Sequence, residues 1–450
     1  MISQKKYDAV VVGAGISGLL SALALAKERK TVLLLEKTSL LGGNCRSYNI
    51  AGFQVDTGVH AITSLKKGPL VELMNKYFDI VPRFLPHGHY YVRSENKLLR
   101  FPSTLQSLAR FNMFSKKDRL IIARSFIDAT KNHTFDEKEL DKSVYDFIKK
   151  YDFSQSALKF IDTVCYFLSG KSMEETPVWR ILSGGGTTDE LSRGIKKKIS
   201  GIVGIVKNNN ISGHGYPAGG IRSITNAILM SIPIGRVTIN TDEAATKIRK
   251  KGNAFLTTTK KGKYRSGIVI FTAEVKTLPS LIENKLPQDF KDSLLNLKQS
   301  KALTLWLGLK QKRKEFDYIG SEVFSNSDTP YWAMPVSNYD PQFAPPGTQL
   351  IGFTSALTGG RTEKEQSELL LDTIKGLFPG IEKGIIMKHI QVTTPEKAAI
   401  TVGARFPGPR TPISGLYLAG TDTDTRSMGV TRAAHSVEEM LKELKKDKVI

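Results

Sequence analysis

The chain has 450 residues, of which 40% are hydrophobic and 24% charged, enough for two or three folded domains with a large core. Its 65 Lys and Arg residues exceed its 43 Asp and Glu residues and give a net charge of +22. This charge favours anionic partners, but no DNA- or RNA-binding motif is recognisable and no nucleic-acid partner is expected. Two cysteines without a CxxC pair and only seven histidines predict no disulfide framework and no metal site, and favour a reducing cytoplasm.

The first predicted element is a short, β-branched strand over residues 7–12, which leads into a glycine motif. Gly13 permits a tight turn, Gly15 lets the backbone approach a pyrophosphate, and Gly18 lets the next helix pack closely on the strand. The N-terminus of that helix directs N–H groups and a positive dipole end at the phosphates. The uncharged run 9–26 also suits a signal peptide or membrane span, but its regularly spaced glycines argue against both. The motif reads Gly13-Ala14-Gly15-Ile16-Ser17-Gly18.

A second strand is predicted over residues 31–35, and it ends at Glu36, followed by Lys37. An acid about 20 residues beyond the glycine motif accepts hydrogen bonds from a ribose hydroxyl in dinucleotide-binding proteins. Strand, glycines, helix, strand and acid in this order predict a Rossmann-type domain. The competing interpretation is a glycine-containing turn in some other α/β protein.

The segment after Glu36 carries further glycines, Leu41-Gly42-Gly43-Asn44-Cys45-Arg46-Ser47, and then Gly52-Phe53-Gln54-Val55-Asp56-Thr57-Gly58-Val59-His60. It resembles the N-terminal signature of the FAD-dependent amine oxidase superfamily, and its Asp-Thr-Gly-x-His run is most similar to phytoene desaturases, carotenoid isomerases and retinol saturases. The resemblance implies non-covalently bound FAD. It places Lys37, Gly42, Gly43 and Arg46 among the cofactor contacts, with Arg46 near the phosphates or the flavin. It also implies that Gly58, Val59 and His60 pass the isoalloxazine ring.

Two later regions extend the resemblance. Strands over residues 236–240, 255–259 and 268–272 are similar to the sheet that covers the adenosine half of FAD, and Ala245 begins a segment similar to the turn that contacts adenine. Near the C-terminus, a strand over 415–419 is followed by a closing helix. Thr421 stands where the family often has an acid, and Asp422 is a candidate substitute. The resemblance implies that this region holds the ribityl chain and the flavin through Gly420, Thr421, Met428, Gly429 and Val430.

The predicted fold class is α/β, with a Rossmann-type (GR2-like) FAD-binding domain built on a parallel sheet and an interleaved α+β substrate domain. The FAD-binding domain is expected to be discontinuous and to comprise residues 1–65, 215–285 and 395–450. The substrate-binding domain comprises residues 66–214 and 286–394. Within it, Ser115 is a predicted helix N-cap, and residues 302–309 and 349–354 are predicted strands.

Two side chains are candidates for catalysis. His60 follows the glycine expected beside the flavin and titrates near neutrality, so it suits proton transfer, although a packing role accounts for it equally well. Lys301 precedes a predicted strand at a place where amine oxidases carry a lysine that contacts flavin N5 through water. A solvated lysine at the strand edge is the competing interpretation. Cys45 is interpreted as a packing residue.

Residues 193–207 combine consecutive lysines with isoleucine and valine at helical spacing. A basic amphipathic segment of this kind can lie in a membrane interface. An anionic membrane surface is therefore a candidate partner, and the protein is a candidate peripheral membrane protein. Its glycines weaken it as a free helix. The alternative is a substrate-domain helix with its apolar face in the core.

The resemblance implies an FAD-dependent oxidoreductase that acts on C–C bonds of an apolar polyprenoid, by hydride transfer between an allylic carbon and flavin N5. Such chemistry needs a dry, aligned tunnel rather than a nucleophile. An amine oxidase or protoporphyrinogen oxidase-like activity is a second hypothesis, because these enzymes share the cofactor frame. A non-enzymatic prenyl-binding protein of the GDP dissociation inhibitor type is a third. The sequence leaves the oligomeric state open.

Overall fold

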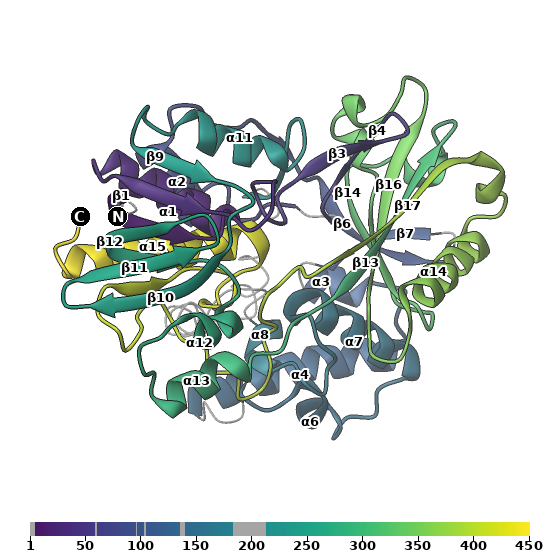
Figure 1. The fold of residues 1–450 in the computed structure, drawn as a ribbon. Helices are drawn as coiled ribbons and strands as arrows, with labels where there is room; N and C mark the ends of the chain where they lie inside the picture. The colour runs from purple at the N-terminus through teal and green to yellow at the C-terminus, as the bar shows by residue number, and fades with distance from the viewer. Residues whose placement is uncertain (1–4, 59–60, 96, 103–104, 136–139, 183–212) are drawn as a thin grey trace.

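The computed structural model describes residues 5–58, 61–95, 97–102, 105–135, 140–182 and 213–450. Two large sheets organise this part of the chain, and a group of helices lies beside the second sheet (Figure 1). The first sheet has the order β10-β11-β12-β1-β2-β9, and β18 also pairs with β12. Its strands are β1 (Lys5–Val12), β2 (Val32–Leu35), β9 (Val237–Asn240), β10 (Ala245–Lys251), β11 (Ala254–Thr259), β12 (Lys263–Phe271) and β18 (Leu416–Leu418).

The centre of the first sheet is parallel and buried. β1 pairs in parallel with β2 and β12, and β12 pairs in parallel with β18, so segments from both ends of the chain and its middle share one sheet. Strands covered on both faces are expected to be rich in valine, isoleucine and leucine, and the burial of β1 and β2 agrees. The sheet confirms the predicted α/β fold with a Rossmann-type parallel core.

Helices cover one face of this sheet. Helix α1 contacts the C-terminal helix and two others, and their apolar side chains form one buried cluster with the strands. The other face packs against two short helices, and the antiparallel β10–β11 hairpin extends the sheet at one edge. Ala245 begins strand β10, so the prediction of a turn at this residue is wrong. The helices are α1 (Ile16–Lys27), α2 (Pro69–Tyr77), α11 (Arg222–Met230), α12 (Leu278–Leu281), α13 (Gln288–Leu295) and α15 (Gly429–Lys446).

The second sheet has the order β17-β13-β16-β15-β14-β6-β7. Strand β13, next to the edge strand β17, is buried along its whole length and has the predicted bounds, and α14 (Glu363–Leu377) packs against it. Two small ribbons, β3–β4 and β5–β8, complete the strands. The bounds are β3 (Ser47–Ile50), β4 (Phe53–Asp56), β5 (Phe84–Pro86), β6 (His89–Ser94), β7 (Lys97–Arg100), β8 (Gly215–Pro217), β13 (Ala302–Leu309), β14 (Gly320–Phe324), β15 (Tyr331–Met334), β16 (Gln349–Ala356) and β17 (Ile385–Thr393).

Helices from the middle of the chain pack beside the second sheet around an aromatic core. Ser115 caps α4, because its hydroxyl accepts a hydrogen bond from the Asp118 N–H at 3.0 Å, as predicted. Within the described ranges, no helix is both long enough and apolar enough to cross a bilayer. The basic segment 193–207 lies outside the described residues. The helices are α3 (Leu105–Ala109), α4 (Lys116–Phe135), α6 (Val144–Ile148), α7 (Gln155–Ser169) and α8 (Val178–Leu182).

Candidate functional site

One cavity of about 880 Å³ extends from the glycine turn after β1 into the helices beside the second sheet. This volume lies within the range of sites that take small molecules and cofactors. Its wall combines backbone from the first sheet with aromatic side chains from the helices. The cavity therefore has two halves. We call the half around Gly15, Gly43 and Gly429 the glycine half, and the half around Phe114, Phe160 and Phe167 the aromatic half.

The glycine turn leaves room for a ligand at one position. Gly15 has a φ of −70°, which any residue adopts, yet a Cβ placed on it would meet no protein atom within 4 Å. By contrast, a Cβ on Gly18 would lie 1.9 Å from the Gly13 oxygen. Gly18 therefore permits the close packing of α1 on β1, and Gly15 opens toward the cavity. This open cradle at a helix N-terminus fits the pyrophosphate of FAD.

A second glycine pair lies against the first. The Gly42 N–H donates to the Ala14 oxygen at 2.8 Å, and a Cβ on Gly43 would lie 3.1 Å from the Gly15 Cα. Cys45, three residues later, is a free and buried cysteine. Burial raises the pKa of its thiol well above the usual range, and an inert, protonated thiol agrees with a packing role.

Glu36 ends β2 beside the glycine turn. Its Oε2 accepts a hydrogen bond from the Ala14 N–H at 2.8 Å, and its Oε1 accepts from the Thr38 N–H at 2.9 Å and from the Thr38 hydroxyl at 3.0 Å. These donors fix the carboxylate next to the first helix. The acid thus supports the turn in addition to the ribose contact expected from the sequence.

The cavity brings together only part of the predicted cofactor set. The residues that line it are Gly15, Ile16, Ser17, Gly42, Gly43, Thr421, Met428, Gly429 and Val430, together with Lys301. The other described candidates do not line it: Gly13, Ala14, Gly18, Glu36, Lys37, Arg46, Gly58, Ala245 and Gly420. Val59 and His60 lie outside the described residues, so the catalytic role of His60 stays a prediction.

The C-terminal part of the wall follows β18. Thr421 faces the cavity, and α15 begins at Gly429, which has a φ of +52° and no atom within 4 Å of an added Cβ. Asp422, the candidate substitute for the family's acid, does not line the cavity, and its role stays a prediction. Its side chain is buried away from the cavity, with Oδ2 accepting the Val275 N–H at 2.8 Å.

A buried carboxylate already contacts the N-terminus of α15. Glu396 lines the cavity, and its Oε1 accepts the Gly429 N–H at 2.6 Å, while its Oε2 lies 3.2 Å from Arg432 Nη1. Burial raises the pKa of Glu396, and the nearby guanidinium opposes that shift. Arg180 is also fully buried here, and burial together with Arg432 lowers its pKa to about 9. No local sequence pattern indicates this group, because its members lie far apart in the chain.

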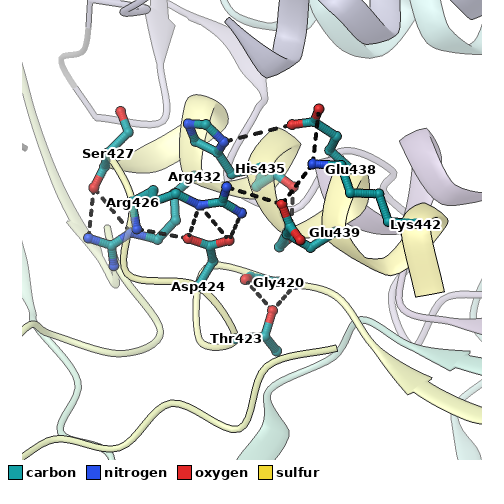
Figure 2. Close-up of polar contacts among 12 residues, drawn as sticks. Gly420, Thr423, Asp424, Arg426, Ser427, Arg432, His435, Glu438, Glu439 and Lys442 are labelled. Atoms are coloured by element: carbon teal, nitrogen blue, oxygen red, sulfur yellow. Dashed lines mark hydrogen bonds and ion pairs between the residues drawn. The ribbon is translucent and has the colours of Figure 1, made fainter. Parts of the chain in front are cut away.

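The loop between β18 and α15 is held by further ion pairs (Figure 2). Arg426 Nη2 donates to Asp424 Oδ2 at 2.5 Å, and its Nη1 donates to Glu439 on α15 at 3.1 Å. Arg432 donates to the Ser427 oxygen at 2.9 Å. These contacts tie the loop that carries Thr421 and Met428 to the helix that follows it.

Two lysines reach the wall between the sheets. Lys301 stands just before β13, and its side chain is exposed and lines the cavity. Lys397 donates to the Thr272 oxygen at 2.7 Å, next to the glycine turn. Lys397 was missed in the sequence because it precedes no recognisable element. The role of Lys301 toward flavin stays a prediction.

The aromatic half of the cavity is apolar. Phe167 of α7 stacks on Trp332 of β15, with ring centroids 3.5 Å apart and planes at 13°. Phe114 meets Phe160 edge to face at 5.2 Å. Aliphatic and aromatic side chains from α4, α6, α7 and α8 complete the wall, with the lining residues Ile122, Val144, Phe147, Ile148, Phe160, Ile161, Val164, Val178, Ile181 and Leu182.

Comparison with known proteins places this arrangement in a family. The family model described as flavin containing amine oxidoreductase matches residues 16–436. A chloroplastic prolycopene isomerase of Daucus carota is 22% identical over 96% of this chain and 79% of the relative. An all-trans-retinol 13,14-reductase of Rattus norvegicus is 36% identical over 22% of this chain and 17% of the relative. The predicted resemblance to the carotenoid- and retinoid-related branch is confirmed.

Solved structures share the fold. An oxidoreductase from Methanosarcina mazei has a TM-score of 0.77 and 21% identity, covering 97% of this chain and 100% of its own. A double mutant of putrescine oxidase has a TM-score of 0.74 and 12% identity, covering 99% of this chain and 100% of its own. Because the family model spans the chain from its first helix to its last, the chain belongs to the flavin containing amine oxidoreductase family, and it is an oxidoreductase with FAD as its cofactor.

Proposed function

We propose that this oxidoreductase acts on carbon–carbon bonds of an apolar polyprenoid, by desaturation, saturation or isomerisation. The observation that carries the proposal is the continuity of one cavity from the glycine half into the aromatic half. A long apolar substrate would lose its contact with water along the aromatic wall, while its reacting carbon lies at the cofactor. Binding energy gained along the chain would then align the reacting bond.

The residues of the glycine half suit FAD in the following way. The backbone at Gly15 and Gly43 would approach the pyrophosphate, and Thr421 and Gly429 would face the flavin. Bound FAD supplies two-electron transfer at its N5 atom. The protein orients the substrate and excludes water, with the Phe167–Trp332 stack as part of the wall.

Two relatives support this substrate class. The names of the prolycopene isomerase and the all-trans-retinol 13,14-reductase both refer to polyenes built from prenyl units. The isomerase matches nearly the whole chain but at low identity, and the reductase matches only a short part of it. The two relatives therefore support a substrate class and not a particular compound.

An amine oxidase-like activity is the second candidate, and a protoporphyrinogen oxidase-like activity belongs with it. The cavity-lining Lys301 and the fold shared with putrescine oxidase favour this alternative. Membership of an oxidoreductase family favours either enzyme over a non-enzymatic prenyl-binding protein.

The test is anaerobic flavin chemistry with the purified holoprotein. The oxidised protein is mixed separately with three prenoids in detergent micelles (phytoene, prolycopene and all-trans-retinol), with a porphyrinogen and with a panel of amines. The three prenoids are also added to the reduced protein. We expect changes in flavin absorbance and altered double bonds in the product only with prenoids. Flavin reduction by an amine, with peroxide formed on admitting oxygen, would instead establish the alternative.

A further inference from the structure

A tyrosine–histidine pair is a polar feature of the cavity wall that the predicted motifs do not explain. Tyr90 of β6 and His214, just before β8, both line the cavity, and the Tyr90 hydroxyl lies 2.7 Å from His214 Nδ1. The His214 backbone is fixed as well, because its oxygen accepts the His87 N–H at 3.0 Å. His214 is therefore held at two points, its ring by Tyr90 and its backbone by His87.

The pair lies close to the elements expected around the flavin. Gly215, next to His214, exchanges two backbone hydrogen bonds with Ile62, at 2.8 and 2.9 Å. The following residue, Thr63, contacts the Thr431 hydroxyl at 3.0 Å on the first turn of α15. Ile62, Thr63 and Thr431 all line the cavity. This chain of contacts connects the segment that carries His214 to the first turn of α15.

The surroundings of the pair favour a neutral imidazole. Burial lowers the pKa of His214 and raises that of Tyr90. The other titratable ring beside the pair is His87, whose ring centroid lies 4.6 Å from that of Tyr90 and whose pKa is lowered to about 3, mainly by burial. His87 contacts Ser321 and Tyr339 instead of His214 with its side chain. Within the described part of the chain, the side chain of His214 is hydrogen-bonded through Nδ1. In the neutral tautomer whose Nδ1–H donates to the Tyr90 oxygen, Nε2 is the nitrogen that can accept a proton.

We infer that His214 exchanges the substrate proton in the proposed reaction and that Tyr90 positions its ring, an inference that rests on the proposed function. In the desaturation direction, His214 Nε2 takes a proton from one carbon while a hydride leaves the neighbouring carbon for the bound oxidised flavin. The electron pair of the deprotonated C–H bond becomes the new π bond, so the substrate loses two electrons and the flavin gains two. In the saturation direction, the hydride comes from the bound reduced flavin, and the π electron pair forms the second C–H bond with a proton that His214 first takes up from solvent and then donates from Nε2.

The primary test compares His214→Gln and Tyr90→Phe with wild type, each as the FAD-loaded protein. The control is His89→Gln, because His89 lies on the same strand and outside the cavity wall. Anaerobic flavin reduction by phytoene and reoxidation by all-trans-retinol are followed by absorbance. We expect His214→Gln to slow them roughly 100- to 10,000-fold with unchanged flavin content, and Tyr90→Phe to slow them less. His89→Gln should match wild type.

Two further readouts separate a catalytic role from a packing role. In deuterated water, deuterium should enter the retinol product of wild type at the carbon that receives the proton, and this incorporation should slow in parallel with the flavin step in His214→Gln. Nitrogen NMR of labelled histidine should show a neutral ring in wild type and an altered Nδ1 signal in Tyr90→Phe. A wild-type rate in His214→Gln, or an Nδ1 signal that Tyr90→Phe leaves unchanged, overturns the inference. If the wild-type protein reacts with no prenoid, the proposed function is wrong. If the wild-type protein reacts and the variants react equally fast, only the inference about His214 is wrong.

Discussion

At the scale of single residues, the two glycines of the first turn have different tasks. Gly15 has ordinary backbone angles and open space where a Cβ would be, whereas a Cβ on Gly18 would overlap the Gly13 oxygen. Gly15→Ala should therefore leave the protein folded and weaken FAD binding more than tenfold, about 1.4 kcal/mol, because the new methyl occupies the space of the pyrophosphate. Titration of the apoprotein with FAD, followed by flavin fluorescence, measures this loss.

Gly18→Ala serves as the matched comparison. Alanine is the better helix former by about 1 kcal/mol, so helix propensity alone would make this variant more stable. The overlap with a backbone oxygen should reverse the sign and lower the free energy of unfolding by about 1–3 kcal/mol, as measured by urea denaturation of the apoprotein. Equal stability and equal FAD affinity in both variants would show that the turn does not hold the cofactor.

At the scale of elements, the loop between β18 and α15 depends on the Asp424–Arg426 pair (Figure 2). Burial alone would raise the pKa of Asp424, but the hydrogen bonds from Arg426 outweigh it and hold the pKa below its ordinary value of 3.8. The carboxylate therefore contributes stability that is complete above about pH 4 and is lost as the pH falls through the lower folded-state value. Asp424→Asn should loosen the loop and speed FAD release at neutral pH, and this difference from wild type should shrink in more acidic buffer.

Flavin fluorescence during thermal release, recorded across the pH range, measures this effect. Lys446→Gln is the matched control, because it removes an exposed ion pair from the far end of the same helix, where little stability is expected. A pH-independent difference between Asp424→Asn and wild type would contradict the assignment of the effect to this carboxylate.

The elements also show which parts of the fold the sequence could predict. The turn from β1 through Gly18 to α1, the acid Glu36 and strand β13 were predictable, because each is encoded by neighbouring residues of fixed spacing. The resemblance to the family predicts a turn at residues 245–248, which instead begin strand β10, and no local pattern reveals their pairing with β11. The contact of Glu396 with Gly429 spans 33 residues and depends on how two segments fold together, so no local pattern reveals it.

At the scale of the whole molecule, the cavity is formed only when distant segments meet. Its wall joins Gly15 near the N-terminus, Phe160 from the middle helices and Gly429 near the C-terminus. The predicted FAD motifs specify the glycine half, because that half uses backbone and short spacings. The aromatic half uses side chains of α4 to α8, whose apolar periodicity is typical of any helical core. The sequence could therefore predict the cofactor but not the shape of the substrate space.

The net charge of +22 is a property of the whole molecule. It predicts that the protein binds an anionic membrane surface, from which an apolar substrate could reach the cavity. We expect the holoprotein to float with vesicles that contain phosphatidylserine and to remain free with neutral phosphatidylcholine vesicles, because each basic residue near an anionic surface contributes about 1 kcal/mol. Binding should fall as salt shortens the screening length from about 10 Å at 0.1 M to about 3 Å at 1 M.

Replacing Lys196, Lys197 and Lys198 by alanine should abolish flotation if segment 193–207 makes the contact. Replacing three lysines of the β11–β12 turn removes the same charge and is the control, at Lys260, Lys261 and Lys263. Equal losses in the two triple variants would show that net charge alone drives binding, and equal flotation with neutral vesicles would exclude an electrostatic contact.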